Sequence, residues 1–463
     1  MMERPERSPR PLAVVVLAAG AGTRMRSERP KVLHEIAGRS MLGHVLATAA
    51  ALGPERLVLV TGVGADAVAA EAKAVLAGLD APAPALCHQA ERRGTGHAVL
   101  QAAPALGGFE GDLLVLYGDT PLLQAETLLG LLTADAPLRV LGFDAADPTG
   151  YGRLVMEGGE VLNRIVEEKD ADAEERAITA CNSGVMAGDA ALMLRLLERL
   201  TPDNAQRELL LTDLVGLARA EGARVTASFC AESETQGVND RAQLAEAEAL
   251  WQRRARLAAM RAGATLQDPG STILSHDTVL EEDCWIGANV VFGPGARVCR
   301  HGVVRPFCHI ENTIIGSGAV VGPFVRLRDG TSIGPGAQVG NFVEMKNADF
   351  GPGAKAGHLS YLGDASIGAK TNIGAGTITC NYDGVDKHRT EIGREAFIGT
   401  GSALIAPVSV GDGAYVATGA VITEDVPGDA LAIARARQVT KPGRASLLRR
   451  FLEGRKANKA KNG

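Results

Sequence analysis

Two patterns of apolar residues divide the chain. Between residues 12 and 240, short apolar runs alternate with stretches rich in alanine and leucine that favour helices; the clearest runs are 13–17, 57–61 and 113–116. Alternation of this kind is typical of an α/β domain built on a largely parallel sheet. We therefore predict an α/β domain over residues 12–240.

A different pattern begins near residue 264, where an apolar residue recurs every six positions. The repeat is unbroken through Ile392, Ile398, Leu404, Val410, Val416 and Ile422, and it also runs through 286–310 and 315–339. A period of six fits neither an α-helix nor a flat strand. It is the signature of a parallel β-helix, in which three hexapeptides make one coil and the apolar residues stack. We predict a β-helix over residues 264–440, with a loop at 380–391 where the register breaks.

The remaining segments join or flank these two regions. Asp240 and Gln243 form a candidate capping box, and the helical spacing that starts at Leu244 stops at Gly263, which predicts one linker helix over 241–263. Residues 441–463 carry eight basic residues and one acidic residue. On composition we expect a disordered N-terminus over 1–11 and a flexible basic tail over 441–463.

Charge and cysteine content narrow the class of protein. A net charge of −6 gives no overall field that would attract nucleic acid or acidic lipid, so we expect neither as a partner. Seven scattered cysteines without a C-x-x-C spacing favour free thiols and a cytoplasmic location. The apolar run 12–19 ends in a glycine-rich loop with Arg24 and Arg26, which argues against a secretory signal. No stretch is long enough to span a membrane.

The glycine-rich loop is the first candidate site. Residues 17–25 read Leu-Ala-Ala-Gly-Ala-Gly-Thr-Arg-Met, and Pro-Lys-Val-Leu-His follows at 30–34. Glycines let the backbone approach a triphosphate, which Arg24 and Lys31 can neutralise. The loop lacks the third glycine of a dinucleotide fingerprint and the ending of a P-loop. Asp119, at the end of an apolar run, is a candidate Mg²⁺ ligand; an ordinary turn aspartate is the alternative.

Together these two segments resemble the sugar-1-phosphate nucleotidyltransferases. The resemblance implies a Rossmann-like domain, UTP as substrate, Arg24 and Lys31 as catalytic residues, and Asn239 as a second Mg²⁺ ligand, for which a helix cap is the alternative. The nucleotide-binding residues it implies are Leu17, Ala18, Ala19, Gly20, Lys31, Gln89, Gly94 and Thr95, and the sugar-phosphate residues are Gly152, Glu167, Asn182 and Asn239. Ala21 departs from the family pattern, where lysine is common.

A second candidate site lies within the hexapeptide region. Three motifs there are unusually polar, namely Arg-Leu-Arg at 326–328, Asn-Phe-Val-Glu-Met-Lys at 341–346 and Lys-Ala-Gly-His-Leu-Ser-Tyr at 355–361. Acetylation of an amine by a thioester needs a base to take the ammonium proton, and a neutral histidine can serve near pH 7. His358 is our candidate base, against the ordinary alternative of a surface histidine.

Over about residues 12–440 the chain resembles the bifunctional N-acetylglucosamine-1-phosphate uridyltransferase and glucosamine-1-phosphate acetyltransferase family. That resemblance implies a left-handed β-helix, acetyl-CoA as the second donor, homotrimers with acetyl sites between chains, and a product that feeds peptidoglycan and lipopolysaccharide synthesis. In the acetyl site it implies Arg328, Lys346, Tyr361 and Asn372 for the sugar phosphate, Asn381 and Tyr382 for both substrates, and Ala375, Thr400, Thr418 and Arg435 for acetyl-CoA. Relatives often carry serine and alanine at the two threonines.

Two alternatives stay open at this stage. The β-helix could only regulate or oligomerise a nucleotidyltransferase, as in enzymes like ADP-glucose pyrophosphorylase, although Lys346, His358, Asn381 and Tyr382 argue against this. The whole chain could instead be a non-catalytic scaffold resembling the nucleotide-exchange subunits of translation initiation. The presence of Lys31 and of the complete glycine-rich loop argues against that alternative.

Overall fold

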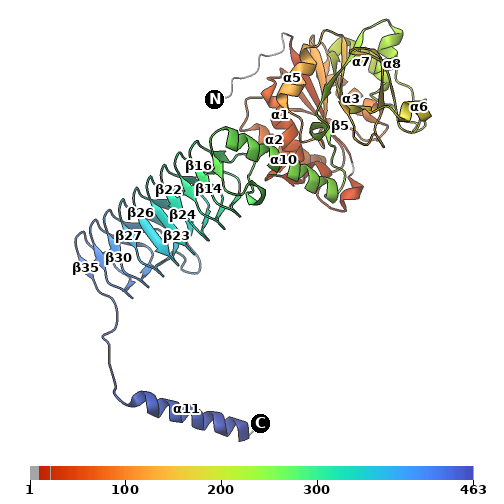
Figure 1. Ribbon diagram of the computed structural model, residues 1–463. Coiled ribbons are helices and arrows are strands. Elements are labelled where there is room, and N and C mark those ends of the chain that lie inside the picture. Colours follow the sequence, from red (N-terminus) through yellow and green to blue (C-terminus); the bar gives the residue numbers. More distant parts are fainter. Residues whose placement is uncertain (1–9, 21, 462–463) are drawn as a thin grey trace. The chain divides into compact units, whose positions relative to one another are not determined.

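The computed structural model describes residues 10–20 and 22–461. The disorder expected for residues 1–9 and the departure at Ala21 therefore lie outside the described residues. The disorder expected for Arg10 and Pro11 is wrong, because Arg10 pairs with Asp112 and Asp189 and the Pro11 carbonyl accepts from the Asp112 amide. The chain divides into two compact units (Figure 1). The first contains residues up to Arg261 together with Leu274–Asp277, and the second contains Ala262–Ile273 and the chain from Thr278 onward.

A nine-stranded sheet forms the centre of the first unit, in the order β5-β4-β1-β6-β10-β7-β11-β9-β8. Its strands are β1 (Leu12–Ala18), β4 (Arg56–Thr61), β5 (Ala85–His88), β6 (Asp112–Tyr117), β7 (Leu138–Asp144), β8 (Arg153–Gly158), β9 (Val161–Val166), β10 (Ala180–Asp189) and β11 (Val225–Cys230). Strands β5, β4, β1 and β6 run parallel, whereas β10 is antiparallel to both β6 and β7. The α/β prediction is confirmed, but the sheet is mixed rather than largely parallel.

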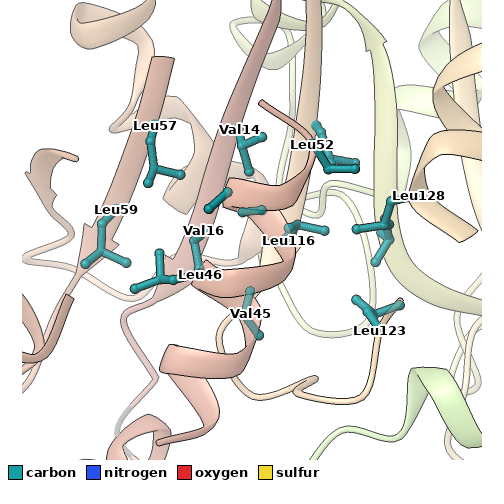
Figure 2. Close-up of a cluster of buried hydrophobic side chains, with 14 of the residues drawn as sticks. Val14, Val16, Val45, Leu46, Leu52, Leu57, Leu59, Leu116, Leu123 and Leu128 are labelled. Carbon is teal, nitrogen blue, oxygen red and sulfur yellow. The ribbon is translucent and has the colours of Figure 1, made fainter. Parts of the chain in front are cut away.

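Helices cover both faces of this sheet. The helices of this unit are α1 (Met41–Ala51), α2 (Ala65–Leu76), α3 (Thr95–Leu100), α4 (Ala103–Leu106), α5 (Ala125–Thr133), α6 (Ala173–Arg176), α7 (Ala190–Leu197), α8 (Asp213–Ala220), α9 (Glu232–Thr235) and α10 (Arg241–Arg261). Every residue of β1 is buried. Val14 and Val16 point to one face and pack with α1, α2 and α5 (Figure 2), while Val15 and Leu17 pack with α3, α7 and α8 on the other. Burial on both faces explains the continuous apolar runs of the central strands.

The predicted linker helix exists, but it is part of the first unit. Helix α10 packs Ala247 and Trp251 against Ile36 and Met41, next to the hairpin of β2 (Glu35–Ile36) and β3 (Arg39–Ser40). Only half of the expected capping box forms. Asp240 accepts the Gln243 amide at 2.9 Å, but the Gln243 side chain accepts from the amide of Asn239 instead of that of Asp240.

The second unit is a parallel β-helix, as the six-residue period predicts. One column of strands contains β12 (Thr265–Leu266), β14 (Trp285–Ile286), β17 (Val303–Val304), β20 (Val320–Val321), β23 (Gln338–Asn341), β25 (Lys355–His358), β27 (Asn372–Ile373), β30 (Phe397–Ile398), β33 (Tyr415–Val416) and β35 (Leu431–Ala432). Ile286, Val304 and Val321 pair in register and are fully buried. Stacked apolar side chains thus fill the interior of the coils.

The other strands form the remaining faces of the coils. They are β13 (Val279–Leu280), β15 (Val291–Phe292), β16 (Ala296–Val298), β18 (His309–Ile310), β19 (Thr313–Ile315), β21 (Arg326–Arg328), β22 (Thr331–Ile333), β24 (Glu344–Phe350), β26 (Tyr361–Ile367), β28 (Ile378–Cys380), β29 (Thr390–Ile392), β31 (Ala403–Ile405), β32 (Val408–Val410) and β34 (Val421–Ile422). The predicted loop is slightly shorter than expected, because Cys380, Thr390 and Glu391 belong to strands.

The expected disorder of the C-terminal tail is wrong for α11 (Arg444–Lys461). Arginine, lysine, leucine and alanine are strong helix formers, so this segment is helical in spite of its high charge. All seven cysteines are free thiols, as predicted. Within the described chain, no helix is both long and apolar enough to cross a membrane.

Candidate active sites

The glycine loop leaves the end of β1 and passes over Lys31. Gly22 has φ +60, and a Cβ there would lie 2.5 Å from the Cβ of Lys31. Any larger residue would therefore be strained and would also collide with the lysine. The short 3-10 helix η2 (Lys31–Leu33) then presents Lys31 beneath the loop. Gly22 and Lys31 are therefore in contact, so the glycine-rich loop and the segment that begins at Pro30 belong to one site.

Three distant segments meet at the Lys31 ammonium group. Its Nζ lies 2.5 Å from Oδ2 of Asp119 and 3.1 Å from Oδ1 of Asn239. Asp119 follows β6, and Asn239 precedes α10. Asp240 caps that helix by accepting amide hydrogens from Ala242 and Gln243, so the Asn239 side chain is not the cap. The capping alternative for Asn239 is therefore wrong.

A cavity of about 230 Å³ opens beside Lys31. All eight predicted nucleotide-binding residues line it. Gln89 is buried, and its Nε2 contacts the Gly94 carbonyl at 3.3 Å and His97 Nδ1 at 3.0 Å, while Thr95 Oγ1 accepts from the Leu211 amide. These contacts fix the far wall of the cavity before any ligand binds.

Sequence reasoning missed three polar residues of this cavity, namely Arg92, Tyr117 and Glu208. Arg92 stands three positions after Gln89, so its charge next to a predicted nucleotide contact was an available signal. In the sequence, Tyr117 cannot be distinguished from the apolar residues of the strand that it ends. Glu208 comes from a distant loop with no motif around it.

The structure does not bring Arg24 into the nucleotide cavity. Its side chain is exposed on the 3-10 helix η1 (Thr23–Met25). It lines a separate groove with Arg26 and Arg241. This arrangement gives no support to the prediction that Arg24 neutralises a triphosphate, because Arg24 lines this other groove and not the nucleotide cavity.

Three of the four predicted sugar-phosphate residues of this site, Gly152, Glu167 and Asn182, lie together, whereas the fourth, Asn239, lies at Lys31. The Asn182 amide donates to the Gly152 carbonyl at 2.8 Å, and a Cβ at Gly152 would meet the Glu167 carboxylate at 3.5 Å. Glu167 Oε1 accepts from Thr212 Oγ1 at 3.0 Å. The neighbouring Asp213 was not predicted. Burial, with the charge of Glu167 and Asp170, raises the pKa of Asp213 to about 6.

In the second unit, His358 ends β25 with an exposed ring. Its Nδ1 lies 2.6 Å from Oδ1 of Asn341, its neighbour on the preceding coil. An amide oxygen only accepts, so Nδ1 donates and Nε2 carries the free lone pair. Asn341, which had no assigned role at the sequence level, therefore sets the tautomer in which His358 can act as a base.

Basic residues gather on the adjoining face. Arg328 and Lys346 pair in register where β21 meets β24, and the pairing of β24 with β26 brings Tyr361 next to Glu344. Arg328 Nη2 contacts Glu344 at 3.0 Å, and Lys346 Nζ lies 3.4 Å from Asp329. A further lysine, Lys387 of the loop, approaches Lys346, and this nearby ammonium lowers the pKa of Lys387. Arg328 and Lys346, two of the predicted sugar-phosphate residues, thus lie on one surface with Lys387, and Glu344 and Asp329 partly neutralise their charge.

The loop after β28 is held by its own hydrogen bonds. The largely buried Asn381 donates to Asp364 at 2.5 Å, and His388 Nε2 contacts Asp383 at 2.7 Å. That contact with His388 and two backbone amides hold the pKa of Asp383 well below its usual range. Tyr382, 61% exposed, pairs with Lys387 across the loop. The loop therefore presents Tyr382 in a defined conformation.

The predicted acetyl-CoA residues follow one corner of the β-helix. We call His358, Ala375, Thr400, Thr418 and Arg435 the corner column. The Gly401 amide donates to Ala375 O at 2.7 Å, the Gly419 amide donates to Thr400 O at 2.8 Å, and an Arg435 guanidinium nitrogen donates to Thr418 O. A Cβ at Gly401 or Gly419 would meet no atom within 4 Å. This corner is open to an extended ligand. Asn372 lies apart from it in β27, paired with Lys355 and Phe397.

Comparisons with known proteins agree with this division into two sites. Residues 14–210 match the model of a MobA-like NTP transferase domain, residues 312–347 that of a bacterial transferase hexapeptide (six repeats), and residues 389–424 that of a hexapeptide repeat of succinyl-transferase. A solved UDP-glucose pyrophosphorylase complexed with UDP-glucose aligns with 53% of this chain and 99% of its own, at 18% identity and a TM-score of 0.44; no inference rests on that likeness.

Full-length relatives extend the match to nearly the whole chain. The Bifunctional protein GlmU of Jannaschia sp. (strain CCS1) is 52% identical over 98% of this chain and 99% of its own length. The protein of the same name from Xanthobacter autotrophicus is 55% identical over 96% and 98%, respectively. With two site-bearing units in the expected order and this identity across both, the chain belongs to the family of the bifunctional protein GlmU.

Proposed function

We propose that the first unit transfers a uridylyl group from UTP to N-acetylglucosamine 1-phosphate, and that the second first makes this acceptor by acetylating glucosamine 1-phosphate with acetyl-CoA. The observation that carries the proposal is the meeting of Lys31, Asp119 and Asn239 at the wall of a cavity lined by every predicted nucleotide residue. Membership in a family of bifunctional proteins supports a second activity on the β-helix.

In the first site the chain acts by position and charge. The sugar phosphate oxygen attacks the α-phosphorus of UTP in line and pyrophosphate leaves, so no side chain needs to become covalently attached. Lys31 neutralises the developing phosphate charge. The Gly20 region lets the backbone approach the phosphates, and Gln89 contributes to base recognition from the opposite wall.

The donor chemistry of Asp119 and Asn239 fits Mg²⁺. A carboxylate and an amide oxygen both contact one cation, the Lys31 ammonium group. Among the described residues, no group of three or more His, Cys, Asp or Glu side chains is placed to hold a metal ion. Mg²⁺ usually takes one or two protein oxygens and completes its shell with phosphates and water. Bound there, it would supply further neutralisation of the phosphates.

In the second site His358 acts as the base. Nε2 takes one proton from the ammonium of glucosamine 1-phosphate, and the free amine attacks the thioester carbonyl. As the C–S bond breaks, the sulfur takes the remaining extra proton from the nitrogen, so CoA leaves as the thiol and the product is the neutral amide. Asn341 keeps the proton of the ring on Nδ1. Arg328 and Lys346 hold the sugar phosphate, and the corner column offers a path for CoA toward Arg435.

We also propose a homotrimer assembled through the β-helix, and a cytoplasmic location. Phe307, Phe324 and Phe342 stack on consecutive coils with centroids 5.0 and 5.3 Å apart, although each is about half exposed. All three have positive φ, which is unfavourable for residues other than glycine. Burial of these rings against another copy would explain why large apolar residues occupy exposed positions with positive φ. The seven free thiols support a reducing compartment.

Two assays test the function. Purified protein with UTP, Mg²⁺ and N-acetylglucosamine 1-phosphate should release pyrophosphate, and protein with acetyl-CoA and glucosamine 1-phosphate should release free CoA thiol. Absence of pyrophosphate release would overturn the assignment of the first site. CoA release that does not require glucosamine 1-phosphate would overturn the assignment of the second.

A further inference from the structure

Helix α11 carries an exposed apolar face that neither proposed activity uses. Every described side chain from residue 441 to 458 is exposed. Leu447, Leu448, Phe451 and Leu452 are 48, 58, 62 and 50% exposed. Positions i, i+1, i+4 and i+5 of a helix fall on one side, so these four side chains form a single apolar patch over two turns. We call it the α11 patch.

Basic residues surround the α11 patch. Between positions 444 and 458 there is a single acidic residue, Glu453. The same segment contains five basic residues: Arg444, Arg449, Arg450, Arg455 and Lys456. The helix is therefore strongly positive within a chain of net charge −6. The Arg455 guanidinium lies 6.0 Å from the centre of the Phe451 ring, so one cation borders the apolar patch directly. Long basic side chains at such a border can reach a polar layer while their stems cover apolar surface.

The positive charge and the exposed apolar area of α11 together indicate which kind of partner it binds. Nucleic acid would complement the positive charge but gives no reason to expose four large apolar side chains. A second copy of α11 would cover the apolar patch but would bring like charges together. The surface of a bilayer with anionic headgroups satisfies both features, because apolar side chains enter the acyl boundary while arginines contact the headgroups. We propose that α11 binds an anionic membrane surface without crossing it, although the overall net charge had led us to expect no membrane partner.

Flotation of the full-length protein with lipid vesicles tests this inference. Vesicles of 70% phosphatidylcholine and 30% phosphatidylglycerol should carry the protein, and pure phosphatidylcholine vesicles should carry about tenfold less or lower. The uncharged double substitution Leu448→Gln/Phe451→Gln should reduce binding to the anionic vesicles by about tenfold or more. Arg449→Gln/Arg450→Gln should reduce it by a similar factor through loss of charge.

A matched control keeps the result interpretable. Ser446→Gln/Ala457→Gln lies on the opposite side of the helix and should leave vesicle binding within about twofold. Unchanged helical content and unchanged transferase activities in solution will show that each variant is folded. Equal binding of Leu448→Gln/Phe451→Gln and the parent protein would overturn the proposal. Tight binding to duplex DNA without vesicle binding, or self-association through the α11 patch without vesicle binding, would also overturn it.

Discussion

The two units build their candidate sites in opposite ways. In the first, Lys31 meets Asp119 and Asn239, which lie 88 and 208 positions further along the chain, beside a cavity. In the second, Asn341 and His358 are separated by one coil, and the corner column repeats at later coils on an exposed surface. A folded sheet gathers distant residues into a recessed site, whereas a repeating scaffold places residues at fixed intervals on an open surface.

This contrast determines how mutations should act. A lost group in the recessed site leaves other partly buried polar groups without partners, which costs more than the lost contact alone. A lost group on the open corner exposes its neighbours to water, so the damage should stay close to the catalytic step.

The largest effect should follow Lys31→Ala. Uridylyl transfer should fall by about 10³-fold, because the cation that faces the phosphates is removed and Asp119 loses its partner. Acetyl transfer should stay within about twofold of the parent rate. Pyrophosphate release and CoA release measure the two, and Lys73→Ala on the exposed part of α2 is the matched control. A loss of both activities in folded protein would remove the contrast between the units.

The next effect should follow His358→Ala. Acetyl transfer should fall by about 10²-fold or more through loss of the base, and uridylyl transfer should be unchanged. His309→Ala, at a half-exposed histidine elsewhere on the β-helix, should leave both rates intact. Acetylation that continues at the parent rate in His358→Ala would show that this ring is only a surface residue.

The units should also differ in acid stability. Burial, with positive charge from Arg39, His276 and Arg254, lowers the pKa of His44 to about 4, and burial lowers the pKa of His34 and His276 as well. Between pH 6.5 and 4 the unfolded chain then binds more protons than the folded one, so the free energy of unfolding of the first unit should fall as the pH falls. His44 alone accounts for about 2 to 3 kcal/mol.

Urea unfolding at pH 7 and pH 5 measures this effect. In a Trp285→Phe background, the fluorescence of Trp251, whose ring lies 6.1 Å from that of His44, reports on the first unit. His44→Gln should flatten the dependence, and His309→Gln should not. An unchanged slope in His44→Gln would show that His44 does not cause the acid sensitivity.

A smaller effect should follow Gly22→Ala. The added Cβ would collide with Lys31 and sit at φ +60, so uridylyl transfer should fall by about tenfold while the fold is kept. Gly78→Ala, where a Cβ meets nothing within 4 Å, is the control. Parent activity in Gly22→Ala would mean that the crossing of loop and lysine does not position Lys31.

Much of this arrangement could be predicted from the sequence, for different reasons in the two units. The period of six places Ile286, Val304 and Val321 inside the coils because each repeat meets the same environment. In the first unit, the motifs identified the nucleotide residues by resemblance. Glu208 was missed because its loop joins the cavity only through tertiary folding, and the motif did not indicate that Arg24 lines a separate groove.

Two segments outside the sites were also beyond the sequence argument. Leu274–Asp277 belongs to the first unit although the hexapeptide region has already begun, and its backbone is held by Gln252 of α10 and by Ala37. No local sequence pattern predicts that Gln252 and Ala37 bind this segment. For α11, composition gave the charge correctly but did not reveal that four apolar side chains gather on one face of a helix.

The central claim is that one chain holds two separate active sites. The most direct test mixes Lys31→Ala and His358→Ala proteins, each purified alone, with glucosamine 1-phosphate, acetyl-CoA, UTP and Mg²⁺, and measures UDP-N-acetylglucosamine. Each variant alone should form almost none, whereas the mixture should form it at a rate within about threefold of the parent protein, because the acetylated sugar phosphate made by Lys31→Ala diffuses to His358→Ala. A mixture as inactive as its components would contradict the two-site account.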